Sequence, residues 1–300
     1  MRSACIIVTF NSEIRNLSQQ LGHLRNIFED IIIVDNSTDL SSKDEIAYLC
    51  EKEKIELLKV VNNIGIGAAQ NLGLQLIKDR GVERVMFLDD DSCFPENEIE
   101  TLFDQFEMIK DKKPWVIGAG PLVKDVRSGE TIAFGWEKNI LRRIDTDRSV
   151  KEVAFLISSG SLYDFNILTN QIGFLREDYF LDGIDMELGL RITSKGYKTV
   201  VIGSSKMIHY LGDHVKKDNF GKTFYAHEDP VRLYYQTRNH LLILKDLPIK
   251  ATRKYLRVLQ IFKQFQFLAK LRSRKFVDLH MFYLGVLHAV LERRGPYKKP

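Results

Sequence analysis

The sequence predicts an α/β protein with a mostly parallel sheet flanked by helices. Two observations support this fold class. From Met1 to about Leu122, short apolar runs alternate with stretches of helical periodicity, which is typical of parallel strands joined by right-handed crossovers. Polar residues follow each of the first four runs, as expected where a parallel sheet gathers ligand-binding residues at one edge.

The predicted strands are taken in order along the chain. Five apolar runs cover residues 4–10, 31–35, 57–62, 85–88 and 115–122. The residues at or just after the ends of the first four runs are Thr9 and Asn11, then Asp35, then Asn63 and Gly65, and finally Asp89, Asp90 and Asp91. Because parallel strands end at the same edge, we expect these residues to converge there.

Glycines follow the third run but form no complete nucleotide-binding motif. Gly65 and Gly67 are followed by Gln70, where a dinucleotide fingerprint needs a third glycine, and a P-loop motif is absent from the sequence. Gly65 has two possible roles. It can form a tight turn before a helix, and it can let the backbone approach a nucleotide.

The three consecutive aspartates, Asp89 to Asp91, have no lysine or arginine beside them in the sequence. Such a triplet can solvate a loop or cap the next helix. It can also bind a hard cation such as Mg²⁺ or Mn²⁺, because unpaired carboxylates otherwise repel each other. The triplet alone does not decide between these two interpretations.

Composition limits the class of protein. The 300 residues are 44% hydrophobic and 28% charged, which suits one large core, alone or with an appendage, and excludes a disordered chain. Cys5, Cys50 and Cys93 lack metal-like spacing, so we expect reduced thiols in a cytoplasmic protein. The first apolar run is too short for a signal peptide, and the longest run, residues 279–291, is too short to span a membrane.

Seven segments together resemble a known family. They are "IIVTFNS", "IIIVDNSTD", "NNIGIGAAQNLG", "FLDDDS", "SSGSLY", "YFLDGIDMELGLRITSKGYK" and "HYLG". In this order they resemble a family 2 glycosyltransferase with the GT-A (nucleotide-diphospho-sugar transferase) fold, most closely the bacterial rhamnosyltransferase branch. The resemblance covers roughly residues 3 to 245. It implies an inverting, metal-dependent transfer of a sugar from a nucleotide donor.

The resemblance also implies a donor and an acceptor. Residues 234–239, "YYQTRN", are similar to a segment of rhamnosyltransferases and favour dTDP-L-rhamnose, with UDP-galactofuranose or another UDP-sugar as the alternative. The implied acceptor is a hydroxyl of a growing cell-surface glycan or of a lipid-linked oligosaccharide.

By the same resemblance, Asp89 lies near the ribose, Asp91 binds Mg²⁺ or Mn²⁺, and Asp90 occupies a variable position. His209 joins the metal or the diphosphate, in agreement with the affinity of imidazole for Mn²⁺. A carboxylate at a strand end can accept the imide N–H of thymine or uracil, and the resemblance assigns this role to Asp35. Thr9 and Asn11 lie nearby, and Asn63 and Asn71 are weaker candidates for the nucleoside and phosphate walls.

The acceptor hydroxyl needs a general base. Asp182, Asp185 and Glu187 lie at a predicted helix start, where free N–H groups favour carboxylates. The spacing favours Asp182 as the cap and Asp185 as the base. The family motif places an acid where Ile184 stands, and Asp182 is a candidate replacement. Glu187 is expected to pair with Arg191, four residues on.

The segment 157–164 resembles the loop beneath the acceptor site, in which Ser159 and Gly160 are weak candidates for acceptor contacts. An ordinary turn explains the same two residues equally well.

Charge divides the chain into a catalytic domain and an extension. Residues 231–300 carry 16 Lys and Arg against 3 Asp and Glu, a net charge of +13, which leaves −9 for residues 1–230. We expect a catalytic domain over 1–230, with a nucleotide-binding half (1–122) and an acceptor half (123–230), followed by a basic helical extension over 231–300.

The extension contains an apolar stripe at helical spacing, formed by Val258, Ile261, Phe262, Phe265 and Leu268. This stripe either packs in a helical hairpin or, with the surrounding basic residues, holds the protein at the inner face of the plasma membrane through anionic lipid. A homo-oligomer formed through these helices is a further alternative. Nucleic acid could attract the same positive charge, but we do not expect it as a partner of an enzyme that builds glycans.

Two rival functions use some of the same residues. A glycoside hydrolase also needs paired carboxylates, but it needs neither Asp35 nor the aspartate triplet. A non-catalytic nucleotide-sugar binder needs the sheet edge but not Asp185.

Overall fold

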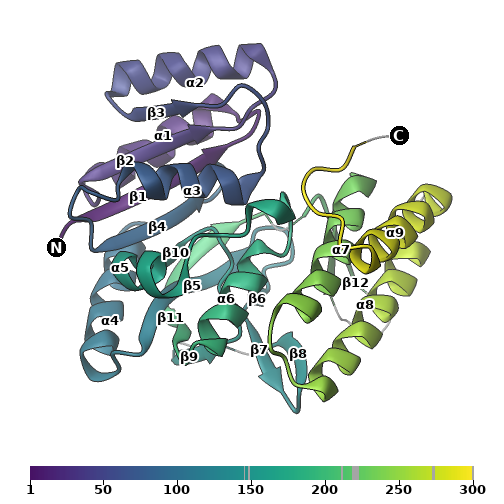
Figure 1. Cartoon of the computed structure of the whole chain (residues 1–300). Helices are drawn as coiled ribbons and strands as arrows, with labels where there is room; N and C mark the ends of the chain where they lie inside the picture. Colours follow the sequence, from purple (N-terminus) through teal and green to yellow (C-terminus); the bar gives the residue numbers. More distant parts are fainter. Residues whose placement is uncertain (145, 148, 211, 218–222, 272–273, 299–300) are drawn as a thin grey trace.

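The computed structural model describes residues 1–300 except 145, 148, 211, 218–222, 272–273 and 299–300 (Figure 1). Its main sheet has the strand order β3-β2-β1-β4-β10-β5-β11-β9, and β6 pairs with β5 at one side. The strands of this sheet are β1 (Ser3–Thr9), β2 (Asp30–Asp35), β3 (Glu56–Lys59), β4 (Arg84–Asp89), β5 (Val116–Asp125), β6 (Thr131–Ile132), β9 (Val150–Val153), β10 (Ser161–Asp164) and β11 (Lys198–His209).

The five predicted strands are confirmed as β1 to β5, with bounds that differ by no more than three residues. β1 pairs in parallel with β2 and β4, and β2 pairs in parallel with β3. β10 lies antiparallel between β4 and β5, so the sheet is mixed but mostly parallel. As predicted, the ends of β1, β2 and β4 share one edge.

Helices cover the sheet on two faces, and the alternation of side chains along β1 explains this arrangement. Ala4 and Ile6 belong to the larger core cluster, whereas Cys5 and Ile7 belong to the second. The larger cluster includes side chains of α3 (Ile66–Leu76), α6 (Ile184–Ser194) and α7 (Pro230–Asp246). The second includes side chains of α1 (Ile14–Leu24), α2 (Leu40–Glu53) and α4 (Glu98–Lys112). Each face of the sheet therefore has its own core.

Smaller elements lie within residues 123–230. β7 (Phe134–Glu137) pairs with β8 (Ile140–Arg143), and β12 (His214–Lys217) pairs with β13 (Thr223–Ala226). Short helical turns occupy Phe165–Ile167, Leu168–Ile172 and Glu177–Tyr179. The last of these turns leads directly into the segment before α6.

The extension forms three helices beside the catalytic domain, namely α7, α8 (Ala251–Leu271) and α9 (Lys275–Val290) (Figure 1). Ile261 and Phe265 of the predicted stripe are buried with Phe282 of α9, and the Phe265 and Phe282 rings stack with centroids 3.9 Å apart. This part of the stripe therefore packs within a hairpin, while Phe262 is 38% exposed. The side chain of Leu268 lies outside the described residues.

Residues after 230 pack into the same apolar core as residues before 230. Leu242 and Ile243 of α7 and Ala289 of α9 belong to the larger core cluster of the catalytic domain. The proposed division near residue 230 thus separates regions of different charge that share a continuous core. Within the described part of the chain, no helix has both the length and the apolar character needed to cross a membrane.

Candidate active site

Asp35 ends β2 at the ligand edge and is fully buried. Its Oδ1 accepts hydrogen bonds from Thr9 Oγ1 and from the Ser37 backbone N–H, each at 3.1 Å. Its Oδ2 has no hydrogen-bond partner among the described residues. A buried acceptor without a partner is costly unless a ligand donates to it, so Asp35 has the free atom that a pyrimidine imide requires.

Amide side chains order the loops around Asp35. Asn11, at φ 51°, accepts through Oδ1 from the backbone N–H groups of Thr38 and Asp39. Asn63 Oδ1 accepts from Asn36 Nδ2 at 2.9 Å and from the Gly65 N–H at 2.8 Å. Asn11 and Asn63 thus hold the loops around Asp35 in place. Asn36 takes part in these contacts, although the sequence did not reveal it.

Gly65 and Asn71 have packing roles in the structure, and their contacts with a ligand stay a prediction. A Cβ on Gly65, which has φ +86°, would lie 2.5 Å from the Phe180 carbonyl oxygen. Asn71 is buried and donates through Nδ2 to Leu175 O and Glu177 Oε1, while its Oδ1 accepts from Leu175 N. Both residues connect α3 to the segment that precedes α6.

Asp89, Asp91 and His209 form the candidate metal centre. One ligand atom from each lies within 4.8 Å of the others, and Asp91 Oδ1 is 3.4 Å from His209 Nδ1. Burial, with repulsion from Asp91 and then from Asp90, raises the pKa of Asp89 to about 8. Burial lowers the pKa of His209 and keeps its imidazole neutral, the form that binds metal. Two carboxylates and an imidazole suit Mn²⁺ or Mg²⁺, and a cation would relieve the repulsion.

Asp90 supports the loop after β1. Its Oδ2 accepts from the Phe10 N–H at 3.3 Å and from Ser12 Oγ. Asp90 thereby connects the ends of β1 and β4, which gives a structural role to the aspartate whose function the sequence left open.

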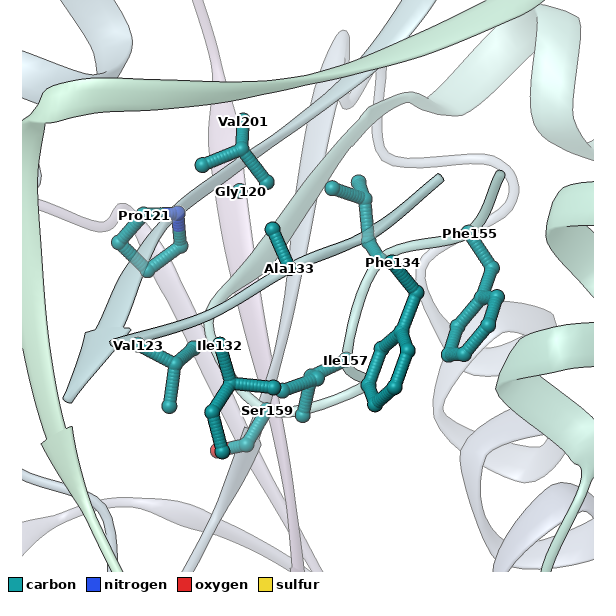
Figure 2. A pocket seen from close by; sticks show the side chains of 11 residues that line it. Gly120, Pro121, Val123, Ile132, Ala133, Phe134, Phe155, Ile157, Ser159 and Val201 are labelled. Atoms are coloured by element: carbon teal, nitrogen blue, oxygen red, sulfur yellow. The ribbon is translucent and has the colours of Figure 1, made fainter. Parts of the chain in front are cut away.

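Ser159 lies behind the metal centre. Its buried hydroxyl accepts from the Asp89 N–H at 2.9 Å and lies 2.6 Å from Ser92 Oγ, which is 3.0 Å from His209 Nδ1. Figure 2 shows Ser159 at the border of an apolar cavity of about 10 Å³, which has room for no more than one water molecule. Its contacts support the candidate metal centre, and its role in an acceptor site stays a prediction.

The structure also explains why residue 160 is a glycine. It has φ +80°, and a Cβ there would lie 2.7 Å from Met207 Sδ. Its N–H donates to the Phe87 carbonyl at 2.8 Å. The segment is therefore a packed turn, the alternative that the sequence left open.

Asp185 lies in the first turn of α6 and is partly buried. Burial raises the pKa of Asp185 to about 6; the charge of Asp182 adds to this rise, whereas the Met186 N–H bond and the charge of Arg232 oppose it. A carboxylate with this pKa can accept a proton near neutral pH. The environment therefore suits the predicted general base.

Asp182 is not the helix cap, so that prediction is wrong. Gly183 occupies the N-cap position at φ 79°, and Asp182 has a left-handed φ of 60°. The Asp182 carboxylate instead pairs with Arg232 at 2.9 and 3.2 Å. Helix propensity favours aspartate as a cap, but the tertiary ion pair directs this side chain away from the helix.

Arg232 of α7 is a site residue that the sequence did not reveal. Its positive charge acts on Asp89 of the metal centre and on Asp185, and it lowers the pKa of both carboxyls. It is therefore close enough to act on both carboxyls, and the Asp182 carboxylate fixes its position. The 50 residues that separate Arg232 from Asp182 leave no local pattern that predicts this pair.

Comparison with known proteins identifies the family. The model of glycosyl transferase family 2 matches residues 4–170. The dTDP-rhamnosyl transferase RfbF of Shigella flexneri is 30% identical over 244 residues, which are 80% of this chain and 79% of RfbF. The chain belongs to glycosyl transferase family 2.

Solved structures support the GT-A fold of this glycosyltransferase. TarS 1–349 of S. aureus in complex with UDP-GlcNAc superposes with a TM-score of 0.59 at 16% identity, covering 98% of this chain and 82% of TarS 1–349. The mannosyltransferase PcManGT of Pyrobaculum calidifontis, in complex with GDP-Man and Mn²⁺, gives 0.59 at 10% identity, covering 97% of this chain and 88% of that one. At these identities the likeness establishes the fold alone.

The "YYQTRN" segment of the glycosyltransferase packs inside the molecule. Arg238 donates to the Tyr179 and Gly295 carbonyls at 2.9 and 2.7 Å. Asn239 Nδ2 lies within 3.0 Å of the carbonyl oxygens of Tyr179, Leu181 and Asp182. This segment therefore holds the turn before Asp185, and its contacts are structural.

Glu187 of the same motif is buried and pairs with Arg191 at 2.9 Å, which confirms the expected spacing of four residues. Arg191 also donates to the Ile172 and Phe174 carbonyls. The pair fixes α6 against the segment that precedes it.

Proposed function

We propose that this glycosyltransferase transfers L-rhamnose from dTDP-L-rhamnose, with inversion, to a hydroxyl of a cell-surface glycan or lipid-linked oligosaccharide. The observation that carries the donor assignment is the likeness to RfbF along four fifths of the chain. A UDP-sugar, such as UDP-galactofuranose, remains the alternative, because the free Oδ2 of Asp35 suits thymine and uracil equally.

Asp89, Asp91 and His209 are the residues that would hold Mg²⁺ or Mn²⁺ at the diphosphate. When bound, the cation supplies Lewis-acid stabilisation of the charge that develops on the departing diphosphate. Arg232 adds a fixed positive charge that acts on both Asp89 and Asp185. The chain thus provides cationic support on the leaving-group side and a base on the acceptor side.

Asp185 takes the proton of the acceptor hydroxyl while the oxygen of that hydroxyl attacks the anomeric carbon. The bond between that carbon and the diphosphate oxygen breaks, and the electron pair leaves with the nucleoside diphosphate. A single displacement inverts the anomeric configuration. Among the described residues we assign no second carboxylate as a nucleophile, because Asp182 and Glu187 are both engaged by arginines.

The proposed place of action is the cytoplasmic face of the plasma membrane, where a lipid-linked acceptor would lie. The extension carries the basic excess, and α9 has an exposed apolar stripe formed by Phe276, Tyr283, Leu287 and Val290. Aromatic and basic side chains together favour an anionic lipid surface. A dimer formed through the same stripe is the alternative.

Replacement of the base tests the mechanism. Asp185→Asn keeps the shape of the side chain but removes its basic oxygen, so transfer from dTDP-L-rhamnose should fall by about 10²-fold or more. Donor affinity, measured by calorimetry with Mg²⁺ present, should remain close to that of the wild type. Asp182→Asn is the matched control: if it abolishes transfer while Asp185→Asn remains active, Asp182 is the base.

A further inference from the structure

Arg257 of α8 is a positively charged side chain with an unusual environment. Its Nη2 lies 3.2 Å from His240 Nδ1 and 3.9 Å from Met186 Sδ, and its Nε is buried without a hydrogen-bond partner among the described residues. No described carboxylate forms a salt bridge with it. Arg84, Arg191 and Arg232, by contrast, each pair with an acidic side chain.

An unpaired charge in this position costs stability. Removing a guanidinium from water is unfavourable unless an anion compensates it, and apolar residues of similar volume are often as stable or more stable. Burial lowers the pKa of Arg257 to about 10, so the group remains a cation at neutral pH. The chain therefore maintains a costly positive charge that its own described residues do not neutralise.

His240 is the hydrogen-bond acceptor that orients the Arg257 guanidinium. Burial, and then the charge of Arg257, lowers the pKa of His240, so the imidazole is neutral. Because its Nδ1 faces the Arg257 guanidinium, which can only donate, we assign the imidazole proton to Nε2. His240 Nδ1 therefore accepts from Arg257 and fixes the direction of the guanidinium, whose remaining N–H groups can donate to an anion.

The pair lies near the proposed base and away from the candidate metal centre. Met186, which contacts Arg257, directly follows the base Asp185. His240 is two helical turns along α7 from Arg232, and its ring lies near Gly183, the N-cap of α6. The metal centre, in contrast, is formed by β4 and β11. A group bound by Arg257 would therefore belong to the acceptor rather than to the donor diphosphate.

We propose that Arg257, oriented by His240, forms a subsite for an anionic group of the acceptor, a phosphate or a carboxylate located near the sugar that receives the new bond. This inference rests on the proposed function, because it deepens the acceptor site of that reaction. It predicts that the acceptor is an acidic glycan or a phosphate-linked one.

Direct anion binding tests the subsite without any sugar transfer. Calorimetry would titrate inorganic phosphate, and separately glucuronate, into the full chain with the donor site filled by dTDP and Mg²⁺. We expect at least one probe to bind the wild type, and Arg257→Met to weaken its affinity tenfold or more. Preference for phosphate or for glucuronate would identify the kind of anion.

Lys263→Met is the matched control, because it removes one exposed positive charge from the same helix. It should leave the affinity for the probe unchanged. Arg257→Lys keeps the charge without the planar fork and should have an intermediate affinity. No binding of either probe by the wild type, or equal losses in Arg257→Met and Lys263→Met, would overturn the proposal.

Thermal denaturation separates a binding role from a structural one. Without added anion, Arg257→Met should melt at the same temperature as the wild type or higher, because the uncompensated charge is gone. Phosphate should raise the melting temperature of the wild type but not of Arg257→Met. A clear drop for Arg257→Met without anion would make Arg257 structural and overturn the proposal. Because no assay requires transfer, failure of the proposed reaction would be seen separately.

Discussion

Asp185 is subject to opposing influences that set its basicity. Burial and the nearby Asp182 charge favour its neutral form, whereas the Met186 N–H and the Arg232 guanidinium favour the carboxylate. The net result is a pKa of about 6 against an ordinary value of 3.8. The side chain is thus unprotonated at neutral pH and remains a stronger base than an exposed aspartate.

This environment predicts the pH dependence of transfer. Below pH 6 the carboxyl is protonated and cannot accept the acceptor proton, so kcat/KM should rise with pH and level off above about 6. In Asp182→Asn the rising limb should move to lower pH, because the charge that raises the pKa is removed. This account would be contradicted if kcat/KM of the wild type rose near pH 4, or if Asp182→Asn did not shift the pH at which kcat/KM rises.

The residues of the candidate site could be predicted where the strand pattern placed them at the sheet edge. The ends of β1, β2 and β4 follow from apolar runs, so Thr9, Asp35 and the aspartate triplet could be placed at one edge from the sequence. Arg232 and Asn36 could not, because their partners are distant in the chain and no short pattern announces them. Ser159 and Gly65 were located correctly, but their contacts depend on packing.

Among the elements, the turn before α6 is the most constrained. Phe180, Asp182 and Gly183 all have left-handed φ values of 60° to 79°. Non-glycine residues adopt this conformation at a cost, and surrounding contacts must maintain it. Asn239 supplies three of these contacts, to the Tyr179, Leu181 and Asp182 carbonyls. The direction of Asp185 therefore depends on a side chain from α7.

Asn239 is accordingly a positioning residue. Asn239→Ala leaves buried carbonyls without donors, which should cost about 2 kcal/mol or more of unfolding free energy. It should also lower kcat while the KM for the donor remains nearly constant, because the nucleotide edge is built by other elements. Kinetics and denaturant unfolding would measure both effects.

Gln236→Ala, one helical turn earlier, is the control and should change neither quantity much. A loss of stability in Asn239→Ala with kcat unchanged would mean that the turn keeps its shape without this side chain.

The periodicity of apolar residues predicted which segments form helices and strands. It did not predict which other segments they pack against or pair with. The spacing of Ile261 and Phe265 indicated an amphipathic helix, yet no sequence signal distinguished a membrane from α9 as the surface that covers them. Likewise β10 enters the sheet between β4 and β5 through antiparallel pairs. Pairings between distant segments depend on the whole fold, which local patterns do not encode.

For the whole molecule, the exposed stripe of α9 is the candidate membrane surface. Phe276, Tyr283, Leu287 and Val290 are 90%, 58%, 51% and 68% exposed and lie at helical spacing. The protein should sediment with vesicles that contain anionic lipid, and less so as salt rises, because the basic extension attracts the lipid charge. Tyr283→Glu with Leu287→Glu should abolish this binding and retain transfer to a soluble acceptor.

Substitution is a cleaner test here than truncation, because the residues after α9 support the catalytic domain. Equal sedimentation with neutral vesicles, or binding unaffected by the two glutamates, would contradict membrane docking. A concentration-dependent dimer that the glutamates disrupt would instead assign the stripe to a second copy.

The residues after α9 contact the catalytic domain at the segment before Asp185. Arg294 pairs with Asp246 at 2.7 Å and with Asp178 at 3.1 Å, and the Gly295 N–H donates to the Asp178 carbonyl at 2.6 Å. Arg294 comes 116 residues after Asp178 in the chain. On the ribosome, the nucleotide edge is therefore synthesised long before the segment that steadies the base. We therefore expect sugar transfer to begin only after this late segment has docked.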